Sequence, residues 1–242
     1  MSIEAYIAAQ RANITSISQL PHFSLLGSLT DRLYEKAISL VPKQSPPPFG
    51  QFLLISHRSF LSALTLIGQA QPDDAAPISR RTIEVARLAL AVKRDPNSAM
   101  EWAAYEQRVE RWEARNRGDK PKPLFSKINV PRNHPILLEL EKQIGVLSDS
   151  SVHFTPEYVG SQHWNWTESR IDLRYFISEQ RTIKCSLITL IGTHASMLRI
   201  FDECLDGAFF ADEKWKQLWS DLEAKSKPLT EPFNPTLGTG ED

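Results

Sequence analysis

Hydrophobic residues recur every three or four positions along most of the chain, the spacing that places them on one face of an α-helix. The segment Phe49–Ile67 shows this most clearly, because mainly small residues separate its large apolar ones. The same pattern predicts further helices at Ser2–Gln19, His22–Leu40, Ile78–Arg94, Asn97–Arg117, Pro135–Leu147, Ser178–Leu205 and Asp212–Ala224. We therefore predict an all-α fold, a bundle of several helices.

Prolines and polar stretches separate the predicted helices. Pro21 divides the first two, which we expect to form a helical hairpin, and Pro42–Pro48 forms a linker. Gln69–Pro77 is predicted as a loop, with Asp73 or Asp74 capping the helix that follows. In the charged helix Asn97–Arg117 we expect an inward-facing stripe made of Trp102, Tyr105, Val109 and Trp112.

Residues 162–177 depart from the helical pattern, because apolar and polar residues alternate there in steps of two. This alternation predicts a short β-hairpin inserted into the bundle. Residues 227–242 are rich in proline, glycine and polar residues, which is typical of a loose C-terminal tail. We predict a single helical domain over residues 1–226.

The composition is that of a folded protein with no strong electrostatic field. Hydrophobic residues make up 41%, charged residues 24%, and the formal net charge is −1. The charge gives no whole-chain attraction for nucleic acid or anionic membrane. Glu4 and Arg11 interrupt the start of the chain where a signal peptide needs an unbroken apolar run. We expect a soluble cytoplasmic protein with no membrane partner.

The sequence also limits covalent and cofactor chemistry. Cys185 and Cys204 fall in one predicted helix, where the rise per residue separates them by about 28 Å, too far for a disulfide. The chain contains no glycine-rich phosphate loop, nucleophile elbow, paired-cysteine motif or His-Glu-x-x-His motif. We therefore predict no cofactor and no metal site.

Arg80 and Glu84 lie one helical turn apart and are the first candidates for a functional pair. One interpretation is a surface ion pair that stabilises the helix weakly. The other is a partly buried pair in which the guanidinium of Arg80 binds an anion.

His153 is the second candidate, because it follows Ser148 and Asp149 at the end of a predicted helix. An imidazole among hydroxyls and a carboxylate can act as an acid or base, and Ser148 and Asp149 are candidate ligand-binding residues. A histidine that caps the helix end through the same neighbours explains the pattern equally well.

Three further aromatic side chains have two interpretations each. His194 lies on the apolar stripe of Ser178–Leu205, where a histidine is usually a packed core residue, unless it meets His153 or Glu84 across the bundle. Trp164 and Trp166 are candidate ligand-binding residues that could form an aromatic platform. They could equally bury their indoles between the hairpin and the helices.

Two short segments resemble a family. Arg80-Arg81-Thr82-Ile83-Glu84 and Leu147–Pro156, which contains Leu147-Ser148 and His153, resemble motifs of an uncharacterised bacterial group of HEPN-like helical proteins. Those motifs are an Arg-x-x-x-Glu helix and, later in the chain, a Leu-Ser-x-x-x-His segment. The resemblance covers roughly residues 49–156 and implies a helical bundle. Ribonucleases of the wider HEPN group carry an arginine shortly before a histidine on one helix. Before His153 the corresponding positions hold Ser148, Leu147 and Val146, so this chain departs from the nuclease pattern.

Three functions remain open from the sequence. The first is a non-catalytic helical module that dimerises or binds a protein or RNA partner, in the bacterial stress or defence setting that the resemblance implies. The second is a ribonuclease or other hydrolase whose site combines Arg80, Glu84 and His153. The third is a small-ligand-binding protein with a pocket beneath Trp164 and Trp166.

Overall fold

The fold is an all-α bundle, seen in a computed structural model that describes residues 1–43, 45, 48–99, 105–119, 133–142, 164–167, 170–173 and 175–230. The named elements are α1 (Ile3–Ser18), α2 (Pro21–Leu40), α3 (Pro48–Gly68), α4 (Pro72–Arg94), α6 (Tyr105–Asn116), β1 (Trp164–Thr167), β2 (Arg170–Leu173), α9 (Gln180–Cys204) and α10 (Glu213–Thr230). Residues 135–142 are also helical.

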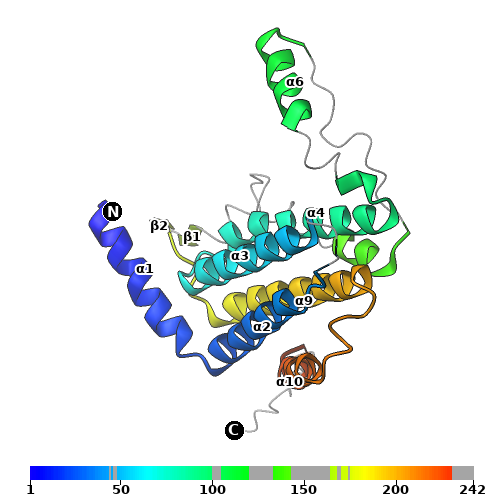
Figure 1. The fold of residues 1–242 in the computed structure, drawn as a ribbon. Coiled ribbons are helices and arrows are strands. Elements are labelled where there is room, and N and C mark those ends of the chain that lie inside the picture. The colour runs from blue at the N-terminus through cyan, green and yellow to red at the C-terminus, as the bar shows by residue number, and fades with distance from the viewer. Residues whose placement is uncertain are drawn as a thin grey trace.

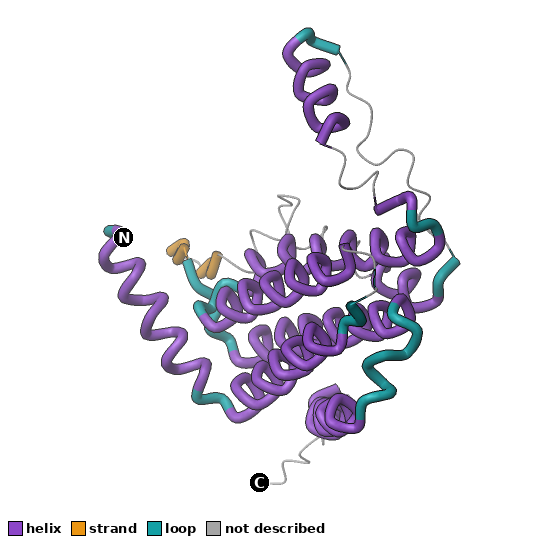
Figure 2. The backbone as a smooth tube through the Cα atoms, in the orientation of Figure 1, coloured by secondary structure: helices purple, strands orange, loops and turns teal. Residues whose placement is uncertain are grey.

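The long helices α2, α3, α4 and α9 form the body of the molecule (Figures 1 and 2). Helix α3 packs along α4, α9 packs against α2, α3 and α4, and α2 also packs against α3. Helix α10 lies against α2 and is seen end-on in Figure 1, whereas α2 runs across the view, so the two helices cross steeply. The first two helices, which were expected to form a helical hairpin, diverge in an open V (Figure 1).

The core consists of the apolar stripes that face one another inside this bundle. The helical spacing predicts these stripes, since most of the apolar positions of α3 and α9 are buried. Leu137 and Leu140 of the 135–142 helix and several side chains of α10 belong to the same cluster. The largest side chains that are almost fully buried are Trp215, Tyr34, Phe49, Phe52, Phe60, Phe201 and Phe209.

Two short strands lie within residues 162–177. Strands β1 and β2 pair antiparallel, with Trp164 opposite Leu173 and Thr167 opposite Arg170. After β2, the amide of Ile177 donates a hydrogen bond of 2.8 Å to the carbonyl of Ala70. This bond ties the segment that precedes α9 to the turn between α3 and α4.

Helix α4 begins earlier than the sequence predicts. The predicted loop Gln69–Pro77 is wrong beyond Gln71, because Pro72 starts the helix and Pro77 lies inside it. Proline suits the first helical turn, where its missing N–H has no intrahelical partner. Asp73 and Asp74 therefore lie in the first turn instead of at the cap, and their charges suit the positive end of the helix.

Two other expectations also differ from the structure. Trp112 was expected to face inward, but its side chain is 65% exposed on α6, which stands away from the bundle in Figure 1. The charged sequence of α6 leaves too few apolar positions to bury a full face. The predicted tail 227–242 begins too early, because α10 continues through Pro228 to Thr230 and buries Leu229. Trp102 and residues 231–242 lie outside the described residues.

Both cysteines lie on α9 as free thiols, as their positions in one predicted helix require, with Cys185 exposed and Cys204 buried. Burial is the main reason that the pKa of the Cys204 thiol rises to about 12. In the part of the chain that the structure describes, no helix combines the length and the apolar character needed to cross a membrane.

Candidate functional site

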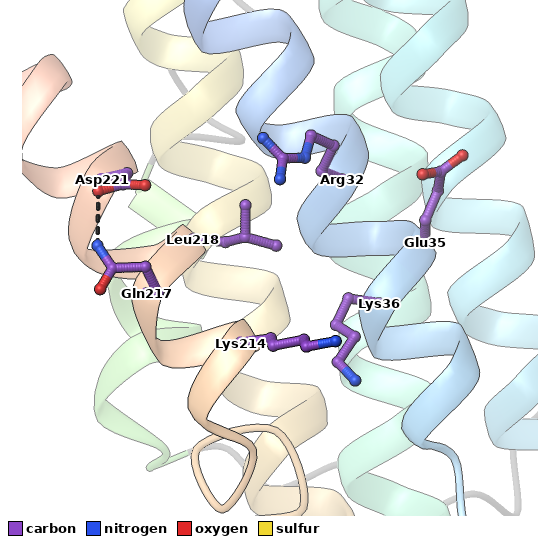
Figure 3. A pocket seen from close by; sticks show the side chains of 7 residues that line it. All are labelled: Arg32, Glu35, Lys36, Lys214, Gln217, Leu218 and Asp221. Atoms are coloured by element: carbon purple, nitrogen blue, oxygen red, sulfur yellow. Dashed lines mark hydrogen bonds between the residues drawn. The ribbon is translucent and has the colours of Figure 1, made fainter.

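A groove lies between α2 and α10 on the surface of the described part of the chain (Figure 3). Arg32, Glu35 and Lys36 form its α2 wall, and they share one face of the helix because they are three and four positions apart. The same spacing brings together the residues of the α10 wall, which are Lys214, Gln217, Leu218 and Asp221. The groove has a volume of about 490 Å³ and is open to solvent.

Helix α10 is held at this place by a buried aromatic side chain. The ring of Trp215 is completely buried, and its Nε1–H donates a hydrogen bond of 3.3 Å to the carbonyl of Leu33 on α2. Trp219 stacks on Trp215 with 5.1 Å between the ring centroids. These contacts fix the distance between the two walls of the groove.

Asp212 connects the start of α10 to α2. Its Oδ2 atom lies 2.9 Å from Nζ of Lys36, and its Oδ1 accepts a hydrogen bond of 2.9 Å from the amide of Trp215. The hydrogen bond from Lys36 and then that from the Trp215 amide lower the pKa of the Asp212 carboxyl, because both favour its charged form. The positive charge of Lys36 is therefore paired with the carboxylate of Asp212.

A second polar group lies in the core, where α2, α3 and α9 meet. The hydroxyl of Tyr34 and Nδ1 of His194 share a hydrogen bond of 2.6 Å, and both side chains are completely buried. Burial is the main reason that the pKa of His194 falls to about 3, so its imidazole is neutral at ordinary pH. Burial also raises the pKa of the Tyr34 hydroxyl well above its usual value.

The neutral states of both groups identify the donor. A Tyr34 O–H that donates to Nδ1 leaves the proton of His194 on Nε2, which has no hydrogen-bond partner among the described residues. The opposite arrangement would leave both the hydroxyl proton and Nε2 unpaired. We therefore assign the Nε2–H tautomer, with the Tyr34 hydroxyl as donor.

His57 lies at the outer edge of this group. Its ring stacks on that of Tyr34 with 5.1 Å between centroids, and its Nε2 lies 2.6 Å from Oδ1 of Asp31. The His57 side chain is 15% exposed and that of Asp31 38% exposed, so the pair reaches the surface. The arrangement joins a surface carboxylate to a buried imidazole through two aromatic side chains, and His194 is packed as its apolar stripe predicts.

The predicted pair of Arg80 and Glu84 lies on the outside of α4. Nε of Arg80 and Oε1 of Glu84 are 3.8 Å apart, and the side chains are 41% and 58% exposed. This geometry agrees with the weak surface ion pair and not with a buried pair that presents a guanidinium to a ligand.

The other predicted site residues cannot be compared with the geometry. His153, Ser148 and Asp149 lie outside the described residues, and for Trp164 and Trp166 only the backbone of β1 is described. Neither the proposed meeting of His153 with Arg80 and Glu84 nor the pocket beneath the two tryptophans is therefore tested.

Sequence reasoning missed most of the residues that form the two sites. Polar residues within apolar helical stripes were the available signal for Tyr34 and His57, as they were for His194. Arg32 and Lys214 gave no signal, because exposed basic residues on amphipathic helices are common. Only the packing of α10 on α2 brings them to one groove.

Among the residues that the structure describes, no group of three or more histidine, cysteine, aspartate or glutamate side chains is placed to hold a metal ion. Comparison of the chain with protein-family models, curated protein sequences and solved structures finds no match.

Proposed function

We propose that the chain is a non-catalytic helical module that acts by binding a protein or RNA partner or a second copy of itself. The observation that carries this proposal is the placement of its acid–base groups. Arg80 and Glu84 form an exposed ion pair on one helix, and His194 is buried and neutral beside Tyr34. A catalytic acid or base needs access to substrate and a pKa near the working pH, and His194 has neither.

We further propose that the fold is HEPN-like and that the protein works in the cytoplasm of a bacterium, in a stress or defence process. The support is the resemblance of the two short motifs together with the all-helical bundle. The arginine and glutamate of the first motif lie one turn apart on α4.

A labelled single-stranded RNA assay, with and without divalent metal, tests the proposal. We expect no cleavage that depends on Arg80 or His153. Robust cleavage by the wild-type chain that both Arg80→Ala and His153→Ala abolish would overturn it in favour of the ribonuclease. Equal faint cleavage by all three proteins would identify a contaminating nuclease. Arg181→Ala, an exposed arginine on α9, is the matched control.

The same RNA, followed by its mobility in a native gel, separates the partners within the proposal. Retarded RNA without cleavage would favour an RNA partner. Unretarded RNA would leave a protein partner or a second copy, which sedimentation equilibrium of the purified chain distinguishes.

A further inference from the structure

Three cationic side chains converge on the groove between α2 and α10. Arg32 and Lys36 lie one turn apart on α2, and Lys214 comes from α10. Figure 3 shows Lys214 extending from α10 toward Lys36 and Arg32 extending from α2 toward α10. Leu218 of α10 lies between the side chains of Arg32 and Lys214 in this view. The positive groups thus come from both walls and face the same space.

The acidic residues nearby have other partners or point elsewhere. Figure 3 shows Glu35, which also lines the groove, on the side of α2 that faces away from α10. Asp212 pairs with Lys36, Asp221 accepts a hydrogen bond of 2.9 Å from Gln217, and Glu213 pairs with Lys216 at 2.6 Å. Within the described residues, neither Arg32 nor Lys214 has an ion pair. Like charges that face one another across a groove repel, and an anion placed between them would reverse the sign of that interaction.

The number of cations and the size of the groove limit the anion. Nucleic-acid-binding proteins can neutralise about six to ten phosphates, more than Arg32 and Lys214 could neutralise together. A volume of about 490 Å³ lies in the range of small-molecule sites. Leu218, which is 9% exposed, offers an apolar surface beside the charges.

We propose that the groove binds a small organic ligand through an oxyanion group, a carboxylate or a phosphate. Arg32 and Lys214 contact the oxyanion from opposite walls, and Leu218 packs against the apolar part of the ligand. This site is separate from the Arg80–Glu84 pair on α4.

Nuclear magnetic resonance of the full chain tests this site with two defined probes, inorganic phosphate and citrate. We expect saturable shifts of backbone amides in α2 and α10 that sodium chloride at equal ionic strength does not reproduce. Shifts with phosphate alone identify a phosphoryl ligand, and shifts with citrate alone identify a carboxylate ligand. Shifts with both support the shared oxyanion chemistry.

The charge-reversal variant Arg32→Glu/Lys214→Glu should bind the effective probe at least tenfold more weakly. Both side chains are exposed, so the variant should fold, and Arg32→Gln/Lys214→Gln provides a milder version. Arg181→Glu/Lys184→Glu, an exposed pair on α9, is the matched control and should bind as the wild type does. Equal affinity of wild type and Arg32→Glu/Lys214→Glu, or shifts that chloride reproduces, would overturn the proposal. The RNA assay would be unaffected by that outcome.

Discussion

The buried contact between Tyr34 and His194 makes the stability of the protein sensitive to acid. The pKa of His194 is about 3 in the folded protein and about 6.5 in an unfolded chain. Between these values the unfolded chain binds one more proton than the folded chain, so acid favours unfolding. The contribution of His194 is therefore fully present above pH 6.5 and is lost as the pH falls toward 3.

We predict that His194→Gln reduces this acid sensitivity. Glutamine can accept the hydrogen bond from Tyr34 but does not titrate, so the free energy of unfolding should fall less steeply below pH 6.5 than in the wild type. The difference should be on the order of 2–3 kcal/mol between pH 6.5 and 4.5. Urea unfolding at several pH values measures it.

His22→Gln is the control for that experiment, because His22 is exposed at the start of α2 and its replacement should leave the pH dependence unchanged. An identical pH dependence in the wild type and His194→Gln would show that burial does not hold His194 neutral.

The sequence predicts the burial of His194 but not its contact with Tyr34. The apolar stripe of α9 predicts that His194 is buried, because a side chain on that face must point into the bundle. Its partner Tyr34 is 160 positions away in the chain. No local pattern specifies such a contact, since it depends on which helices pack together.

Helix positions follow from the sequence more closely than helix ends do. Helical spacing locates α3 and α9 almost to their ends, because their apolar stripes are long and continuous. The ends of α4 and α10 were misplaced at Pro77 and Pro228, which lie inside these helices. A proline costs a helix one hydrogen bond, but the helix continues at both places and buries neighbouring apolar residues, Ala75 and Ala76 near Pro77 and Leu229 beside Pro228.

The connection between α9 and α10 depends on one carboxylate. Oδ1 of Asp202 accepts hydrogen bonds from the amides of Phe209 at 2.7 Å and Phe210 at 3.1 Å, and the residue is 9% exposed. We predict that Asp202→Ala lowers the free energy of unfolding by about 2–3 kcal/mol, because it leaves both amides without a partner. Asp202→Asn, which retains an acceptor, should cost about 1 kcal/mol or less.

Urea unfolding compares these variants with Asp95→Ala. Asp95 also accepts a hydrogen bond from a backbone amide, that of Asn97, but at an exposed position, so its replacement should cost less than about 1 kcal/mol. Equal losses in Asp202→Ala and Asp95→Ala would mean that the connection does not depend on Asp202.

The sequence does not predict which helices pack against one another. Helical spacing predicts that α2 and α10 each have an apolar face, but several helices have such faces and any of them could pair. The hydrogen bond from Trp215 to Leu33 and the ion pair between Lys36 and Asp212 specify this pairing. The groove exists only because of it, which is why charge patterns along the chain did not indicate Arg32 and Lys214.

All the helices of the bundle contribute to one hydrophobic core, from Ile17 of α1 to Leu229 of α10, so they should unfold together. We predict a single urea transition in which far-ultraviolet circular dichroism and tryptophan fluorescence give the same midpoint. Trp215 and Trp219 are buried and report on α10. Fluorescence that changes before the loss of helix would show that α10 unfolds separately and would contradict a single domain.

Trp215→Phe sharpens this test, because it removes the hydrogen bond to Leu33 and part of the stacking with Trp219. The variant should lose about 1–3 kcal/mol, with both probes still giving one shared midpoint. Trp112→Phe on α6 is the matched control, since its exposed ring should change the stability by less than about 0.5 kcal/mol. If Trp215→Phe shifts the fluorescence midpoint and leaves the dichroism midpoint unchanged, α10 is stabilised independently of the four long helices.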